Sequence, residues 1–213
     1  MKIKISIIFL VLLSFFNIGA VSNNNVKGYS FDNLESVYIN KSEFVENGSK
    51  IQYRTKNSIE QEKERVETYL VTNCLVTCKE VTQNSIRFGN DDLQIEAEFW
   101  KDDIDTYAVI TVVNNNPNKK TEELTKILKG LTTEDVIEFQ CYKYYKGRIS
   151  FNDEIEYTDD MCSRIYESNM ISLNNGYTGS GYCRNGEKIN FAISNYNTGA
   201  YIIIGTPIIF TTY

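Results

Sequence analysis

The chain has 213 residues, with 22 basic and 28 acidic side chains, no histidine, and a formal net charge of −6. An acidic protein repels phosphate backbones because it has no counterions to release from them, so its charge disfavours nucleic acid as a partner. The lack of histidine removes the commonest general base, the Ser-His and Cys-His nucleophile pairs and the usual imidazole metal ligand. We therefore predict no histidine-dependent catalysis, and we assign no catalytic residue, metal site or cofactor.

The first 22 residues have the pattern of a secretory signal. Two lysines among the first four residues precede an uncharged apolar run over residues 5–16. Ala20 and Ser22 then place small residues two apart, as signal peptidase requires. An uncleaved anchor is the less favoured alternative, because the run is shorter than the roughly 20 apolar residues that span a bilayer. We expect a mature chain from about Asn23, extracytoplasmic, either secreted or associated with the cell wall or membrane, with no stable membrane insertion after cleavage.

The first half of the mature chain is predicted to contain a strand, a helix, three strands and a second helix. Ser58 with Gln61 forms a capping box, which marks the start of the first helix. The three later strands show alternating apolar and polar residues, and Gly89, Asn90 and Asp91 form a turn between two of them. The expected elements are strands over residues 49–56, 85–88, 92–100 and 107–113, and helices over residues 59–73 and 121–130.

The second half repeats this order, with a strand over residues 136–145, a helix over 153–168, and strands over 170–173 and beyond, 188–194 and 200–210. The predicted fold class is α+β, with two pseudo-repeated β-α-β-β-β lobes, antiparallel sheets and helices packed on one face. The N-terminal lobe spans residues 23–130 and the C-terminal lobe residues 131–213. Similar apolar patterns recur at nearly constant separation, which favours an internal duplication. Chance is the alternative, since two hairpin-rich stretches are easily aligned.

Pairs of adjacent acids are the remaining candidates for catalysis, because two carboxylates suffice to hydrolyse a glycosidic bond. A carboxylate-based hydrolase acting on cell-wall glycan is therefore the alternative function. Each pair also has a structural explanation, in a turn or in the first turn of a helix, where acids favour the helix dipole. The five cysteines cannot all pair, and we expect mostly buried thiols with at most one disulfide. The acid pairs are Asp91-Asp92, Asp102-Asp103, Glu122-Glu123 and Asp159-Asp160.

The C-terminal segments KINFAI (residues 188–193) and YIIIGTPII (residues 201–209), which continue to Tyr213, resemble the YwmB family. These are exported proteins of Gram-positive spore formers, often labelled TATA-box binding because their fold is like the duplicated saddle of that protein. The resemblance covers roughly the last 30 residues. It implies a saddle-like fold, an extracytoplasmic location and a role in the envelope or in sporulation, and it supplies no catalytic residue. Pro207 is predicted to limit pairing at a closing edge strand.

The side chains that alternate outward on two central strands define the candidate binding face. A DNA-reading saddle needs basic groups and intercalating aromatics on this face. Because the predicted outward side chains include two acids, DNA binding is the least favoured function. Acids, amides and aromatics together suit an envelope protein, a peptide or a glycan. The sequence thus predicts an exported, non-catalytic interaction module, and its candidate binding residues are Glu96, Glu98, Trp100 and Asn190.

Overall fold

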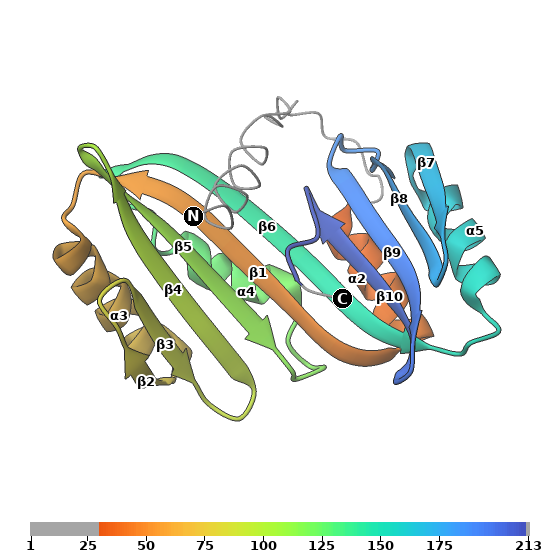
Figure 1. Ribbon diagram of the computed structural model, residues 1–213, viewed down its shortest axis with the longest axis horizontal. Coiled ribbons are helices and arrows are strands. Elements are labelled where there is room, and N and C mark those ends of the chain that lie inside the picture. The colour runs from red at the N-terminus through yellow and green to blue at the C-terminus, as the bar shows by residue number, and fades with distance from the viewer. Residues whose placement is uncertain (1–29, 212–213) are drawn as a thin grey trace.

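The computed structural model describes residues 30–211, so the predicted signal over residues 1–22 lies outside the described residues. Within that range the chain forms four helices and one antiparallel sheet of ten strands (Figure 1). The α+β class is confirmed, but the strands share one sheet instead of forming one in each lobe. In chain order the elements are α2 (Phe31–Lys41), β1 (Glu43–Thr55), α3 (Ile59–Cys74), β2 (Thr77–Val81), β3 (Ser85–Gly89), β4 (Leu93–Asp102), β5 (Asp105–Asn114), α4 (Thr121–Lys129), β6 (Val136–Ile149), α5 (Glu154–Arg164), β7 (Tyr166–Leu173), β8 (Gly176–Tyr182), β9 (Lys188–Tyr196) and β10 (Gly199–Thr206).

The order of strands across the sheet is β2-β3-β4-β5-β1-β6-β10-β9-β8-β7. Along the chain, a helix, a strand, a helix and four strands occur twice, from α2 to β5 and from α4 to β10. The first strands of these two runs, β1 and β6, pair with each other at the centre of the sheet. Each half therefore has one strand more than the sequence pattern predicted.

The predicted alternation is confirmed on β4, and the predicted inward residues of β9 are also confirmed, although the outward residues Ala192 and Ser194 of β9 are buried too. Leu93, Ile95, Ala97 and Phe99 are at most 2% exposed, and the inward residues of β9 are fully buried. One hydrophobic cluster joins the β1–β5 half of the sheet to α3 and α4, and a second joins the β6–β10 half to α2 and α5. In Figure 1, α2, α3 and α4 lie behind the sheet, so the cores fill the space on that side.

Local signals predicted the start of α3 correctly but not the end of α5. The capping box is present, since the Ser58 hydroxyl accepts a hydrogen bond from Gln61 N (3.2 Å) and Ser58 N donates to Gln61 Oε1 (3.0 Å). The predicted helix over residues 153–168 is too long, because α5 ends at Arg164 and β7 starts at Tyr166. Ile165 has an extended backbone and is still buried in the second cluster, so its apolar side chain fits either conformation.

The prediction for the last strand is wrong in two respects. β10 lies between β6 and β9, so it is an internal strand and not the closing edge. It also ends at Thr206, whereas the prediction continued it to Phe210. Proline lacks the N–H needed for a further ladder bond, and strand pairing stops at Pro207. The residues after it turn back over the sheet and bring Phe210 against the tyrosine rings of β6.

The cysteines in the described part of the chain whose side chains are placed are all free thiols: Cys74, Cys141, Cys162 and Cys183. Burial, and to a smaller extent the charge of Glu187, together raise the pKa of the Cys183 thiol to about 12. Within the same residues, no helix is both long and apolar enough to cross a membrane.

We expect Cys183 to react with iodoacetamide at pH 8 at least 100 times more slowly in the folded protein than after unfolding in urea. A thiol with a pKa of about 12 is ionised only to about 1 part in 10,000 at this pH, compared with roughly a quarter of an ordinary thiol. Mass mapping of the alkylated peptide measures both rates, and the unfolded protein is its own control. Equal rates in the two states would show that this thiol is accessible and ionised.

Candidate functional site

The strands present alternate side chains to the face of the sheet that does not carry α2–α5, which we call the outer face. Three aromatic groups lie on it. The first belongs to β4 and β5, the second to β6 together with the segment after β10, and the third to β9 and β10. Their members are Trp100 and Tyr107, then Tyr142, Tyr144 and Phe210, then Tyr196 and Tyr201.

The first aromatic group is a stacked pair. Trp100 and Tyr107 are opposite each other in the β4–β5 ladder, with ring centroids 5.6 Å apart and planes 9° apart. Arg54 of β1 is opposite Tyr107. A hydrogen bond with Tyr107 is the largest cause of the raised pKa of Arg54. Arg54 also forms ion pairs with Asp105 (3.5 Å) and Glu138 (3.0 Å). The stacked pair is thus held beside a cation that already has acidic partners.

The two acids of the predicted binding face point outward, as expected. Glu98 is exposed, and the Glu96 side chain is 42% exposed. Glu96 forms an ion pair with Arg87 of β3 at 2.8 Å, and Arg87 also contacts Glu80 at 3.0 Å. Glu96, Glu98 and Trp100 are at alternate positions of β4, so they share one side of the strand. Together they form a mixed surface of acidic and aromatic groups.

Asn190 does not join that surface. It lies on β9, and four strands (β5, β1, β6 and β10) separate β9 from β4. Because neighbouring strands lie about 4.8 Å apart, the separation is on the order of 24 Å. The Asn190 side-chain amide instead donates a hydrogen bond to the carbonyl oxygen of Pro207. Alternation predicted the correct face, but it contains no information on which strands are neighbours.

The central aromatic group is buried although it lies on the outer face. Tyr144 is fully buried and Tyr142 is 2% exposed. Tyr144 is opposite Gly48 on β1 and Gly205 on β10. A Cβ atom at Gly48 would lie 2.3 Å from Tyr144 Cε1, so the missing side chain gives the tyrosine ring room to lie across the neighbouring strand. The sequence prediction of aromatic side chains on this face did not include the glycines beside them, whose signal is their position inside strand patterns.

The adjacent acid pairs take up structural positions. Asp91-Asp92 lies between β3 and β4, Asp102-Asp103 is at the β4–β5 turn, and Glu122-Glu123 is in the first turn of α4. Asp160 lines a pocket of about 190 Å³ with Lys41, Asp153, Glu156 and Tyr157. Among residues 30–211, no cluster of three His, Cys, Asp or Glu side chains could hold a metal ion.

Asp160 has too many partners to act as a general acid. Burial favours its protonated form, but hydrogen bonds from Arg164 (2.7 and 2.9 Å), Lys41 (3.0 Å) and Tyr38 (3.0 Å) outweigh burial and lower its pKa to about 2. A carboxyl group with that pKa is ionised throughout the range in which wall hydrolysis would occur. Its contacts instead join α2 to α5.

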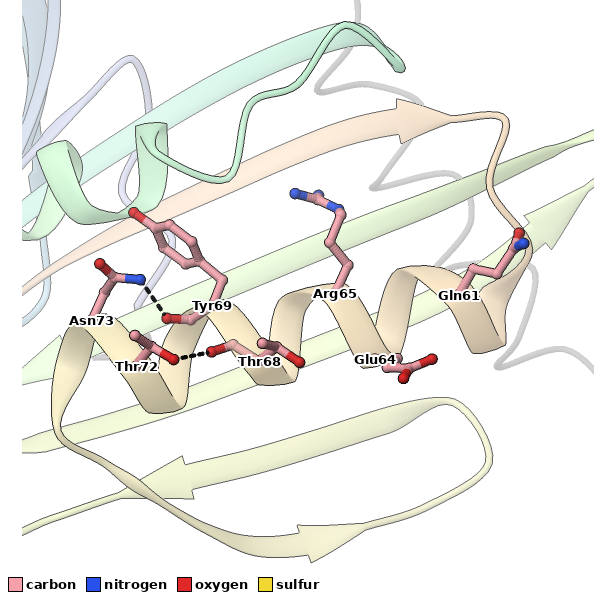
Figure 2. A pocket seen from close by; sticks show the side chains of 7 residues that line it. All are labelled: Gln61, Glu64, Arg65, Thr68, Tyr69, Thr72 and Asn73. Atoms are coloured by element: carbon pink, nitrogen blue, oxygen red, sulfur yellow. Dashed lines mark hydrogen bonds between the residues drawn. The ribbon is translucent and has the colours of Figure 1, made fainter.

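A second hollow runs along α3 and is shown in Figure 2. Its larger polar groups already have partners within the protein. Arg65 donates to the carbonyl oxygen of Leu131 (2.8 Å), and Tyr69 donates to that of Ile127 (2.8 Å). Thr72 and Asn73 donate back to the carbonyl oxygens one turn earlier on the same helix (Figure 2). The hydrogen bonds of Arg65 and Tyr69 therefore join α3 to the end of α4. Because they engage the larger polar groups of the hollow, the outer face is the better candidate for a binding site.

Relatedness to known proteins provides no further assignment. Neither a search against models of known protein families nor a comparison with curated protein sequences finds a match to this chain. The resemblance to the YwmB family thus stays a prediction based on the C-terminal segments. A functional proposal for this protein therefore depends on the chemistry of the outer face.

Proposed function

We propose that the protein is an exported, non-catalytic interaction module of the cell envelope, which binds an envelope protein, peptide or glycan through its outer face. The stacked Trp100–Tyr107 pair is the observation that carries this proposal. Aromatic side chains provide a large contact area at a low cost in conformational entropy. Glu96 and Glu98 on the same strand add directional acceptors around the rings, as the polar groups of a binding surface do.

The finer features of the fold belong to the same proposal. The repeated element order, with β1 and β6 paired antiparallel at the centre, supports a duplicated, saddle-like architecture of two lobes and a relationship to the YwmB family. A two-fold relation between the halves would place equivalent strands at equal distances from the centre. The acids of β4 disfavour phosphate contacts on such a saddle, so the proposed partner is not DNA.

Reversing the charge of the outer-face acids is expected to reduce envelope capture at least tenfold without unfolding the protein. The Glu96→Lys/Glu98→Lys variant loses the exposed Arg87 ion pair, and such surface pairs contribute only about 0–1 kcal/mol. Trp100→Ala should reduce capture to a similar extent because it removes the stacked ring. Capture is measured by co-sedimentation with purified wall sacculi and by pull-down from detergent-solubilised envelope, which separates glycan from protein partners.

The matched control is Glu64→Lys/Glu67→Lys, which makes the same charge change on α3, away from the outer face. It should bind as the wild type does. Normal folding with unchanged capture in both outer-face variants would place the working surface elsewhere.

A further inference from the structure

We propose that the centre of the outer face is a binding site for an apolar peptide carrying an aromatic side chain, and that the chain's own C-terminal segment occupies this site. We call residues 207–211 the tail, and Lys50, Tyr142 and Tyr144 with Gly48 and Gly205 the platform. The inference rests on the proposed function and names the class of partner. The tail is itself the example of a bound peptide from which the chemistry of the site can be deduced.

The aromatic side chain of the tail is held by two tyrosine rings. Phe210 meets Tyr144 edge to face, with ring centroids 4.9 Å apart and planes at 87°. It meets Tyr142 at 6.3 Å and 71°. Edge-to-face packing is a preferred geometry for aromatic pairs, because the positive edge of one ring meets the negative face of the other. The platform thus recognises an aromatic ring by its shape and its charge distribution.

Lys50 adds a cation to the same place. Its ammonium nitrogen lies 4.5 Å from the centroid of the Tyr142 ring and 5.1 Å from that of Phe210. Burial lowers the pKa of Lys50, and the charge of Glu98 partly opposes this effect. A partly desolvated cation near two ring faces favours an aromatic ligand over an aliphatic one. Specificity for an aromatic side chain therefore has two independent sources.

The backbone of the tail is recognised separately from its side chains. The Asn190 amide donates to the carbonyl oxygen of Pro207. A Cβ atom at Gly205 would lie 2.9 Å from the carbonyl oxygen of Ile208 and 2.9 Å from Ile209 Cγ1, so the glycine allows the tail to approach β10 closely. A main-chain hydrogen bond combined with an anchored side chain is a common way in which proteins recognise a peptide segment.

The tail packs on the sheet outside the two hydrophobic clusters. Every residue of β10 is buried, whereas residues 207–211 are all only partly buried. None of the tail residues belongs to either hydrophobic cluster. A tethered segment competes with free ligands at an effective concentration on the order of millimolar. The apparent affinity for a free peptide is therefore reduced in proportion to the fraction of molecules in which the tail has left the site.

The test uses the full chain and a fluorescein-labelled peptide with the sequence of residues 205–213, GTPIIFTTY. Phe210→Ala removes the anchor of the tail and leaves the platform intact. We expect this variant to bind the peptide at least ten times more tightly than the wild type does, as measured by fluorescence anisotropy. Adding Lys50→Gln to it should reverse most of the gain, and a peptide with alanine in place of its phenylalanine should not bind.

Phe151→Ala is the matched control, since Phe151 is 57% exposed in the turn after β6 and is not part of the platform. It should bind the peptide as weakly as the wild type. If Phe210→Ala binds no more tightly than this control, the inference is overturned. It is also overturned if Phe210→Ala fails to fold and Ile209→Ser, which loosens the tail at Gly205, binds no better than the wild type.

The same proteins separate this inference from the proposed function. Envelope capture that depends on Glu96 and Trp100, without peptide binding by Phe210→Ala, would reject the peptide site alone. Peptide binding by Phe210→Ala, with envelope capture insensitive to the Glu96, Glu98 and Trp100 variants, would support the site and reject the wider outer-face proposal.

Discussion

Replacing Glu35 with alanine is expected to lower the free energy of unfolding by about 3 kcal/mol or more, because it leaves several buried donors without an acceptor. Glu35 is a residue of α2 and is fully buried where α2 faces the start of α4. Its Oε1 atom accepts hydrogen bonds from Asn47 Nδ2 (2.8 Å) and Thr121 N (3.1 Å), and the Thr121 hydroxyl also donates to it. The carboxylate thereby caps α4 from another helix, at the end where the helix dipole favours negative charge.

The glutamine variant tests the charge separately from the hydrogen bonds. Burial is the largest influence on the pKa of Glu35 and raises it above 4.5, although the donors from Thr121 and Asn47 oppose the shift. Glu35→Gln should therefore cost much less than Glu35→Ala at pH 7. The stability of the wild type relative to Glu35→Gln should be greatest below pH 4.5 and should decrease as the pH rises through the folded-state pKa.

Urea unfolding at several pH values measures both effects. Glu64→Ala on the exposed side of α3 is the control, with an expected change of at most about 0.5 kcal/mol. A Glu35→Ala variant as stable as this control would show that water replaces the carboxylate without cost. A decrease of the wild-type advantage as the pH falls would give the opposite sign and would mean that the donors outweigh burial.

Short-range patterns predicted those parts of the fold that depend on short-range physics. The Ser58 and Gln61 capping box works because both hydrogen bonds form within a single turn, whatever the rest of the chain does. The alternation on β4 is equally local, since neighbouring residues of a strand must point to opposite faces. The turn at Asn90 was also evident, and its side chain accepts from the backbone of Asp92 (3.0 Å) and Leu93 (2.8 Å).

The elements that were missed have local signals that are interrupted or short. In α2, Phe31, Leu34 and Tyr38 form an apolar stripe that a search for helical spacing would find, and Glu35 lies in the same stripe. An acid in that position interrupts the apolar pattern of the helix. Its role as the hydrogen-bond acceptor for Thr121 depends on a contact that is distant in the sequence. Strand β2 is a five-residue strand at the edge of the sheet, where it pairs with β3.

The candidate site was only half predictable for the same reason. Glu96, Glu98 and Trp100 are together because they alternate along one strand, which a sequence displays directly. Asn190 was grouped with them on the assumption that the two central strands are neighbours, and the sheet order separates them. The site around Phe210 joins residues of β1, β6 and the tail, a contact made by topology alone.

Glu62 is the other fully buried glutamate among the described residues. Unlike Glu35 it has an ionic partner, and it should respond to pH in the opposite way. Glu62 accepts hydrogen bonds from Tyr53 Oη (2.6 Å) and Asn57 Nδ2 (2.9 Å), and it forms an ion pair with Arg65. Burial again favours the protonated form, but hydrogen bonds from Arg65, Asn57 and Tyr53 outweigh it and lower the pKa of Glu62 below 4.5. Arg65 in turn donates to the carbonyl oxygen of Leu131 (2.8 Å), so this network joins α3 to the end of α4.

We expect Glu62→Gln to lower the free energy of unfolding by about 3–5 kcal/mol at pH 7, because breaking a buried pair leaves the remaining charge uncompensated. The loss should be largest above pH 4.5 and should shrink as the pH falls through the folded-state pKa, where the wild-type carboxylate also becomes neutral. Urea unfolding of Glu62→Gln and Glu35→Gln at matched pH values is the measurement, and each variant is the control for the other. Parallel pH profiles would mean that Arg65 does not determine the charge state of Glu62, whereas profiles of opposite slope follow from one glutamate having a cationic partner and the other only neutral donors.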